Sequence, residues 1–145
     1  MERLSSPNCR KMTTDLPSLC PALWDIGNRM TSVSHFFKCL TFAALALIVV
    51  MSLRPSVSIG DVPNMDKFVH FGAYAVLASL ARLGWPKLWG GWIFLGLALF
   101  GIGIEIAQET MNLGRTGSLA DTAANLLGTV FPLLIFHFSG LGIRR

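Results

Sequence analysis

Four long apolar runs fill most of the chain after its first quarter, and short polar segments separate them. The runs occupy residues 36–53, 68–83, 88–107 and 119–138. Each is close to the roughly 20 residues that an α-helix needs to cross the hydrocarbon core of a bilayer. The pattern therefore predicts an all-α fold, an integral membrane bundle of four transmembrane helices.

The second apolar run is the shortest of the four and contains His70 and Arg82. Arg82 lies near the end of the run, where its long side chain can reach the membrane interface. Trp85, Trp89 and Trp92 cluster around the loop that follows, which is typical of an interfacial aromatic belt. These anchors favour a membrane span here in spite of the polar residues.

The composition agrees with a membrane protein. Hydrophobic residues make up 52% of the 145 residues and charged residues only 14%, whereas soluble domains carry about a quarter charged residues. The net charge of +4 is therefore interpreted as a signal for membrane orientation, and we expect no nucleic-acid partner. The cysteines, Cys9, Cys20 and Cys39, match no metal or disulfide pattern and are interpreted as free thiols.

We divide the chain into three parts. Residues 1–34 are rich in proline and polar residues and predict a flexible cytoplasmic tail. Residues 35–140 form the membrane domain, and residues 141–145 form a short basic tail. No signal peptide is expected, because the first apolar run starts late and no small-residue cleavage site follows it. Met30 is an alternative initiator, with the preceding residues as an artefact of gene assignment.

Basic residues are distributed unevenly between the two sides of the predicted domain. Six of them flank the side that holds both chain ends: Arg29, Lys38, Arg82, Lys87, Arg144 and Arg145. Three flank the other side: Arg54, Lys67 and Arg115. The positive-inside rule then predicts a multi-pass protein of the inner (cytoplasmic) membrane with both termini in the cytoplasm. The loops at 54–67 and 108–118 would face outward.

Eight unusual polar residues in or beside the apolar runs fall on this outward side. They are Asp66, Lys67, His70, Glu105, Gln108, Arg115, Asp121 and Asn125. An ionisable residue at the margin of a membrane span is expensive to bury and is a candidate for function. We therefore predict one outward polar cluster. In the alternative interpretation, Glu105 and Asp121 lie at the water interface or pair with Arg115 to lock the hairpin.

A weak internal repeat accompanies this cluster. Asp66 and His70 open the second run, and Asp121 and Asn125 open the fourth. Each pair is four residues apart and so lies on one helix face. Two outward hairpins in parallel orientation would produce such a repeat.

Four short motifs lie in this region: Asp66-Lys67 with His70 and Tyr74, Glu105 with Gln108, Gly114-Arg115, and Asp121 with Asn125 and Gly128. Their order and spacing over about residues 64–130 resemble the VanZ-like family, whose pattern reads D-K-x-x-H, E-x-x-Q, G-R and D-x-x-x-N-x-x-G. The resemblance adds Tyr74 to the candidate ligand-binding residues. It implies an envelope membrane protein, and the founding members are associated with resistance to the glycopeptide teicoplanin.

The cations of the predicted cluster suggest what it binds. Lys67 and Arg115 suit a phosphate or carboxylate head group, and the amides at the start of the second span also favour anions. We therefore expect a protein that engages a lipid-linked or anionic cell-wall component, with the lipid bilayer and a lipid-linked cell-wall precursor as partners. In the alternative, Arg115 forms plain ion pairs with Glu105, Glu109 or Asp121.

The carboxylates and the imidazole of the cluster allow other hypotheses. Asp66, His70, Glu105 and Asp121 could hold a divalent metal, as in a metal-assisted hydrolase or transferase acting on a lipid head group. They could also form a hydrogen-bonded network that fastens the spans, or line the path of a small transporter or assembly subunit. The chain has no Ser-His-Asp order, phosphate-binding glycine loop or HExxH motif. We therefore assign no catalytic residue, cofactor or resident metal, and favour a non-enzymatic protein.

Overall fold

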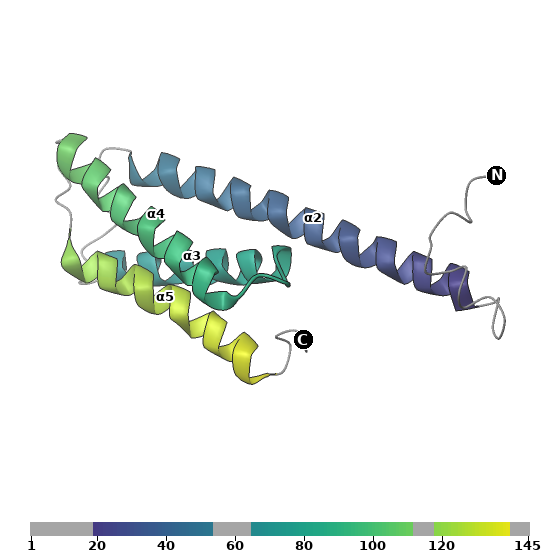
Figure 1. The fold of residues 1–145 in the computed structure, drawn as a ribbon. Helices are drawn as coiled ribbons and strands as arrows, with labels where there is room; N and C mark the ends of the chain where they lie inside the picture. Colours follow the sequence, from purple (N-terminus) through teal and green to yellow (C-terminus); the bar gives the residue numbers. More distant parts are fainter. Residues whose placement is uncertain (1–18, 54–64, 112–117, 140–145) are drawn as a thin grey trace.

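The structure is a computed structural model that describes residues 19–53, 65–111 and 118–139, with side chains from residue 28 onward. These segments form helices and turns and contain no strand, which confirms the predicted all-α fold. The four helices are α2 (Leu19–Ser52), α3 (Met65–Gly84), α4 (Gly90–Met111) and α5 (Leu119–Phe138) (Figure 1).

The start of α2 differs from the sequence prediction. The helix begins at Leu19, whereas residues up to 34 were assigned to a flexible tail. Once a helix is nucleated, each added residue gains a hydrogen bond, so the apolar span can extend helix toward the N-terminus. Pro21 lies in the first turn, where a missing amide hydrogen does no harm. Residues 1–18 and 140–145, which contain the rest of the predicted tails, lie outside the described residues.

Three helical segments are long and apolar enough to cross a membrane, which indicates an integral membrane protein. They are Asn28–Ser52, Gly90–Met111 and Leu119–Phe138. The prediction of four such helices is met only in part, because α3 is not among them. Its sequence holds Asp66, Lys67 and His70 at one end and Arg82 at the other, which lowers its hydropathy.

The position of α3 explains why it is less apolar. It packs most extensively against α5, next against α2, and also contacts α4. The hydrophobic core is built largely from its inner face, where Tyr74, Leu77, Ala78 and Ala81 are buried. Neighbouring helices thus cover much of α3. It therefore exposes less surface to lipid and needs fewer apolar side chains than they do.

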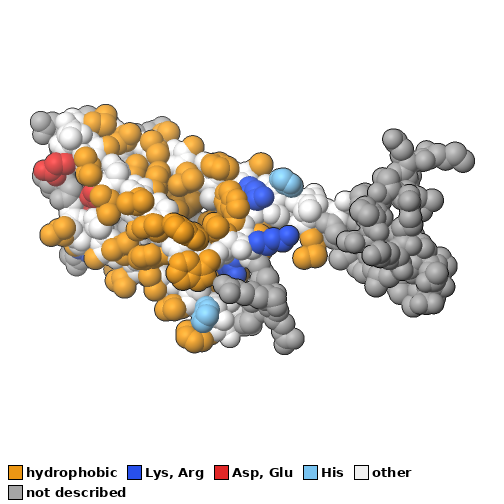
Figure 2. Space-filling model, viewed as in Figure 1, with side chains coloured by type: hydrophobic (Ala, Val, Ile, Leu, Met, Phe, Trp, Pro, Cys, Tyr) orange, Lys and Arg blue, Asp and Glu red, His pale blue; other side chains and the backbone are white. Residues whose placement is uncertain are grey.

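The outer surface of the bundle is apolar. Large exposed side chains include Phe42 and Leu47 on α2, Leu99 on α4, and Leu127 and Phe131 on α5. Hydrophobic side chains dominate the face seen in Figure 2, with acidic groups at one end and basic groups toward the other. Such a surface is suited to lipid contact and would be a liability in water.

The helices α3 and α5 approach each other closely at Gly128. A Cβ atom at this position would collide with the backbone carbonyl oxygen of Phe71. Small residues permit such backbone contact between membrane helices. The contact sets the distance between α3 and α5 just beside His70 and Asn125, so it also positions the polar end of the bundle.

Candidate functional site

The start of α3 presents three polar residues on one face. Asp66, His70 and Tyr74 are spaced by four residues, which stacks them along the same side of a helix. Asp66 lies in the first turn, where a carboxylate is stabilised by the positive end of the helix dipole. The face runs from the exposed Asp66 to Tyr74, which is almost completely buried.

The start of α5 supplies the matching residues. Ser118 is the N-cap of the helix, and its side chain accepts a hydrogen bond from the backbone N–H of Ala120 at 3.2 Å. Asp121 follows in the first turn, and the buried Asn125 lies one turn further along. A serine cap and an early acid are the usual signals for a helix start.

One hydrogen bond joins these two faces. His70 Nδ1 and Asn125 Oδ1 lie 3.0 Å apart, in residues separated by 55 positions. Because an amide oxygen only accepts hydrogen bonds, Nδ1 carries the proton in this pair. The other ring nitrogen, Nε2, then lies 3.8 Å from Asp66 Oδ1.

Asp121 completes a compact group that we name the Asp–His cluster: Asp66, His70 and Asp121. One ligand atom from each of the three lies within 4.8 Å of the others. Two carboxylates this close repel each other unless they share a proton or a positive group lies with them. A protonated His70, a metal ion or a cation of a bound molecule would each satisfy that demand, and Lys67 also lies within electrostatic range of Asp121.

The cluster has the donor set of a metal site. Carboxylate oxygens and an imidazole nitrogen bind divalent metals. A metal-bound histidine commonly donates its second ring N–H to an oxygen acceptor, which fixes the orientation of the ring. Asn125 makes such a contact with His70. Glu105, the fourth residue of the predicted metal set, does not belong to this group.

Glu105 instead fastens α4 to the start of α5. The side chain is buried, and its Oε2 accepts a hydrogen bond from the backbone N–H of Ser118 at 3.0 Å. Ser118 was not among the predicted site residues. A serine directly before an apolar run is a known sign of a helix start and would have indicated it.

Two buried polar atoms beside the cluster lack a hydrogen-bond partner among the described residues. They are the Tyr74 hydroxyl and Glu105 Oε1, and the two side chains lie within electrostatic range of each other. Gly101 makes room for this arrangement, since a Cβ there would lie 3.1 Å from the Tyr74 hydroxyl and 3.4 Å from Asn125 Nδ2. Buried polar groups are nearly always satisfied, so a water molecule or a ligand group fits this position.

Gln108 has a different partner. Its Nε2 donates a hydrogen bond to the backbone carbonyl oxygen of Ser52 at 2.9 Å. The bond satisfies a carbonyl at the end of α2, where intrahelical partners run out. Gln108 therefore ties α4 to α2, and the structure gives it a fastening role apart from the Asp–His cluster.

The predicted site residues thus separate into groups. The Asp–His cluster meets Asn125, and Tyr74 and Glu105 lie deeper beside it. Gln108 contacts α2, and Lys67 is partly buried near the cluster. Arg115, with its neighbour Gly114, lies outside the described residues. No protein-family model, curated protein or solved structure matches the chain, so the family resemblance stays a prediction.

Proposed function

We propose that the protein is a VanZ-like integral membrane protein of the cell envelope that binds an anionic, lipid-linked cell-wall component where α3 and α5 begin. The observation that carries this proposal is the convergence of the Asp–His cluster with Asn125 beside two unpartnered buried polar atoms. Placing such polar groups in a membrane protein costs free energy, so their presence favours a functional role.

The chemistry of the site fits a ligand with mixed polarity. Lys67 offers a cation to phosphate, and the Asp–His cluster offers acceptors to hydroxyl or ammonium groups. A lipid-linked cell-wall precursor carries phosphate next to its lipid and sugar hydroxyls and amines beyond it. A site at the end of a membrane bundle could bind the phosphate and the sugar groups together while the lipid chain remains in the bilayer.

In this proposal α3 crosses the inner membrane with the other three helices, and both termini lie in the cytoplasm. Single cysteines in place of Gly60 and Thr116, with the native cysteines replaced by serine, should then react with an impermeant reagent in intact cells. A cysteine in place of Lys87 should react only after the membrane is opened. The reverse pattern would place the site in the cytoplasm and contradict the proposal.

Binding is tested directly with a polyprenyl-pyrophosphate-linked disaccharide peptide. We expect it to raise the detergent melting temperature of the wild-type protein and to have little effect on Asn125→Ala or Asp121→Asn. Polyprenyl phosphate, which lacks the sugars, separates recognition of the head group from recognition of the lipid chain. Equal shifts for the wild type and both variants would contradict binding at this end.

A second function is favoured by the Asp–His cluster itself, namely metal-assisted hydrolysis or transfer on a lipid head group. In this case the cluster binds a divalent metal that activates water. Purified wild-type protein would then take up stoichiometric Zn²⁺ or Mn²⁺, and Asp66→Ala and His70→Ala would not. Absence of metal uptake by the wild type would exclude this second function and leave the binding proposal intact.

A further inference from the structure

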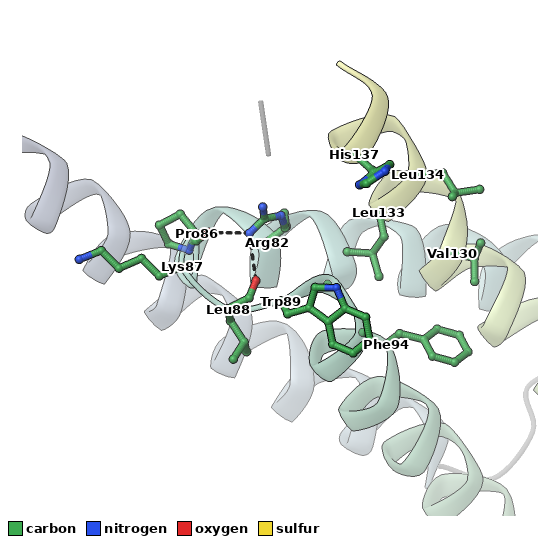
Figure 3. Close-up of a pocket in the computed structure, with 12 residues that line it drawn as sticks. Arg82, Pro86, Lys87, Leu88, Trp89, Phe94, Val130, Leu133, Leu134 and His137 are labelled. Atoms are coloured by element: carbon green, nitrogen blue, oxygen red, sulfur yellow. Dashed lines mark hydrogen bonds between the residues drawn. The ribbon is translucent and has the colours of Figure 1, made fainter. Parts of the chain in front are cut away.

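The opposite end of the bundle contains a cavity of about 710 Å³. It lies between the end of α3, the turn into α4 and the last turns of α5 (Figure 3). Arg82, Lys87 and His137 are in its wall, and no carboxylate is present among the residues that line it. A volume of this size is typical of small-molecule sites, and the basic lining favours an anion.

Arg82 is held in place and still has donors to offer. Its Nη1 donates to the carbonyl oxygens of Pro86 at 2.7 Å and of Leu88 at 3.3 Å. A longer contact of 3.5 Å reaches the carbonyl oxygen of Trp85. All three bonds use the same nitrogen, so Nη2 and Nε form none with the described residues. A guanidinium fixed on one side presents the geometry that phosphate oxygens accept in pairs.

The first residues of α4 add further donors. Gly90 and Gly91 line the cavity, and the amides of a first helical turn have no partner within the helix. A Cβ at Gly91 would displace the Trp89 ring from its present position. Glycine therefore leaves both the ring and the backbone open to the cavity.

The remainder of the cavity is apolar. Phe94, Val130, Leu133 and Leu134 face it, and the Trp89 indole lies between the Arg82 guanidinium and Phe94 (Figure 3). Leu134 is largely exposed and belongs to the apolar outer surface of α5. The cavity thus joins a basic group to a surface suited to acyl chains.

We propose that this cavity binds the phosphate head group of an anionic phospholipid, with Arg82 and His137 at the phosphate and an acyl chain along α5. Basic pockets between membrane helices are suited to such lipids, and Trp89 has the amphipathic ring that prefers the interface. This site is separate from the polar end and does not depend on the proposed function.

The test is native mass spectrometry of the detergent-purified full chain with phosphatidylglycerol and with phosphatidylcholine of the same acyl chains. We expect one phosphatidylglycerol to bind at least roughly fivefold more tightly than phosphatidylcholine. Arg82→Gln and His137→Gln should reduce this preference. Lys38→Gln is the matched control, since Lys38 lies over the Trp85 ring at 5.7 Å and does not line the cavity, and it should retain the preference.

Arg82 also stabilises the α3–α4 turn, so Arg82→Gln could lose lipid binding by misfolding. A second variant therefore tests the cavity without removing this side chain. Gly90→Leu keeps every charge and fills the cavity, where a Cβ would meet only Leu133 at 3.9 Å. It should weaken phosphatidylglycerol binding while the melting temperature stays near that of the wild type. Equal binding of the two lipids, or undiminished preference in Arg82→Gln and Gly90→Leu, would overturn the proposal. Displacement of the lipid by millimolar inorganic phosphate would make this a site for free phosphate and overturn it also.

Discussion

At the end of the bundle where α3 and α5 begin, acidic side chains lie between helices, whereas at the opposite end the basic side chains border a cavity with apolar walls. At the acidic end, polar side chains from different helices contact one another, as His70 does with Asn125. At the basic end, Arg82 bonds only to carbonyl oxygens of the following turn among the described residues. The first arrangement couples α3, α4 and α5 to one another, and the second borders a cavity of about 710 Å³.

The difference predicts that substitutions at the acidic end affect stability as well as binding of the cell-wall precursor, whereas those at the basic end affect phospholipid binding. The largest effect is expected at Gly128. Gly128→Ala forces a methyl group against the Phe71 carbonyl and should reduce the free energy of unfolding by about 1–3 kcal/mol. Gly96→Ala, with open space around it, is the matched control and should be neutral or stabilising. Thermal melting in detergent compares the two, and equal melting temperatures would refute close packing at Gly128.

A smaller loss is expected from Asn125→Ala. The variant leaves the His70 N–H without its acceptor, which costs about 1–2 kcal/mol in a buried setting. His70→Ala alone should cost a similar amount, and the double variant should cost clearly less than the two losses added together. The melting temperatures of all four proteins give the coupling. Strict additivity would mean that the two side chains do not interact.

Tyr74→Phe should have a smaller effect and in the opposite direction. The lost hydroxyl is buried and has no hydrogen-bond partner among the described residues. Removing such a group should leave the free energy of unfolding unchanged or raise it by up to about 1 kcal/mol. If the hydroxyl contacts a ligand, the same variant should weaken binding of the cell-wall precursor without loss of stability. A marked drop in melting temperature would show that the hydroxyl has a structural partner.

The smallest effect is expected from Lys87→Gln at the basic end. Lys87 is exposed, and its ammonium points away from Arg82 (Figure 3). The free energy of unfolding should change by less than about 0.5 kcal/mol. The variant should also keep most of the preference for phosphatidylglycerol, in contrast to Arg82→Gln. If Lys87→Gln lost as much of the preference for phosphatidylglycerol as Arg82→Gln does, the preference would depend on the total charge near the cavity and not on the position of Arg82.

Much of the helical framework could be read from the sequence, because residues that disfavour a helix interior stand at several boundaries of the apolar runs. Pro86 follows the end of α3, and Ser118 caps the start of α5. The extension of α2 to Leu19 was missed, since helix propagation from a stable span is not visible in local composition. The contact of Gln108 with Ser52 was missed as well, because it joins residues 56 positions apart.

By itself, the sequence determined that the protein is helical and apolar, and it predicted that the unusual polar residues gather toward the same end. Spacing of four residues placed Asp66 with His70, and Asp121 with Asn125, on shared helix faces. Only the tertiary structure decided that His70 meets Asn125 and that Glu105 turns to Ser118. The reason is that helix rotation and the close approach at Gly128 select the partners, and neither is encoded in any single helix. The same packing covers α3 with its neighbours, so a helix with lower hydropathy can stand at the centre of a membrane bundle.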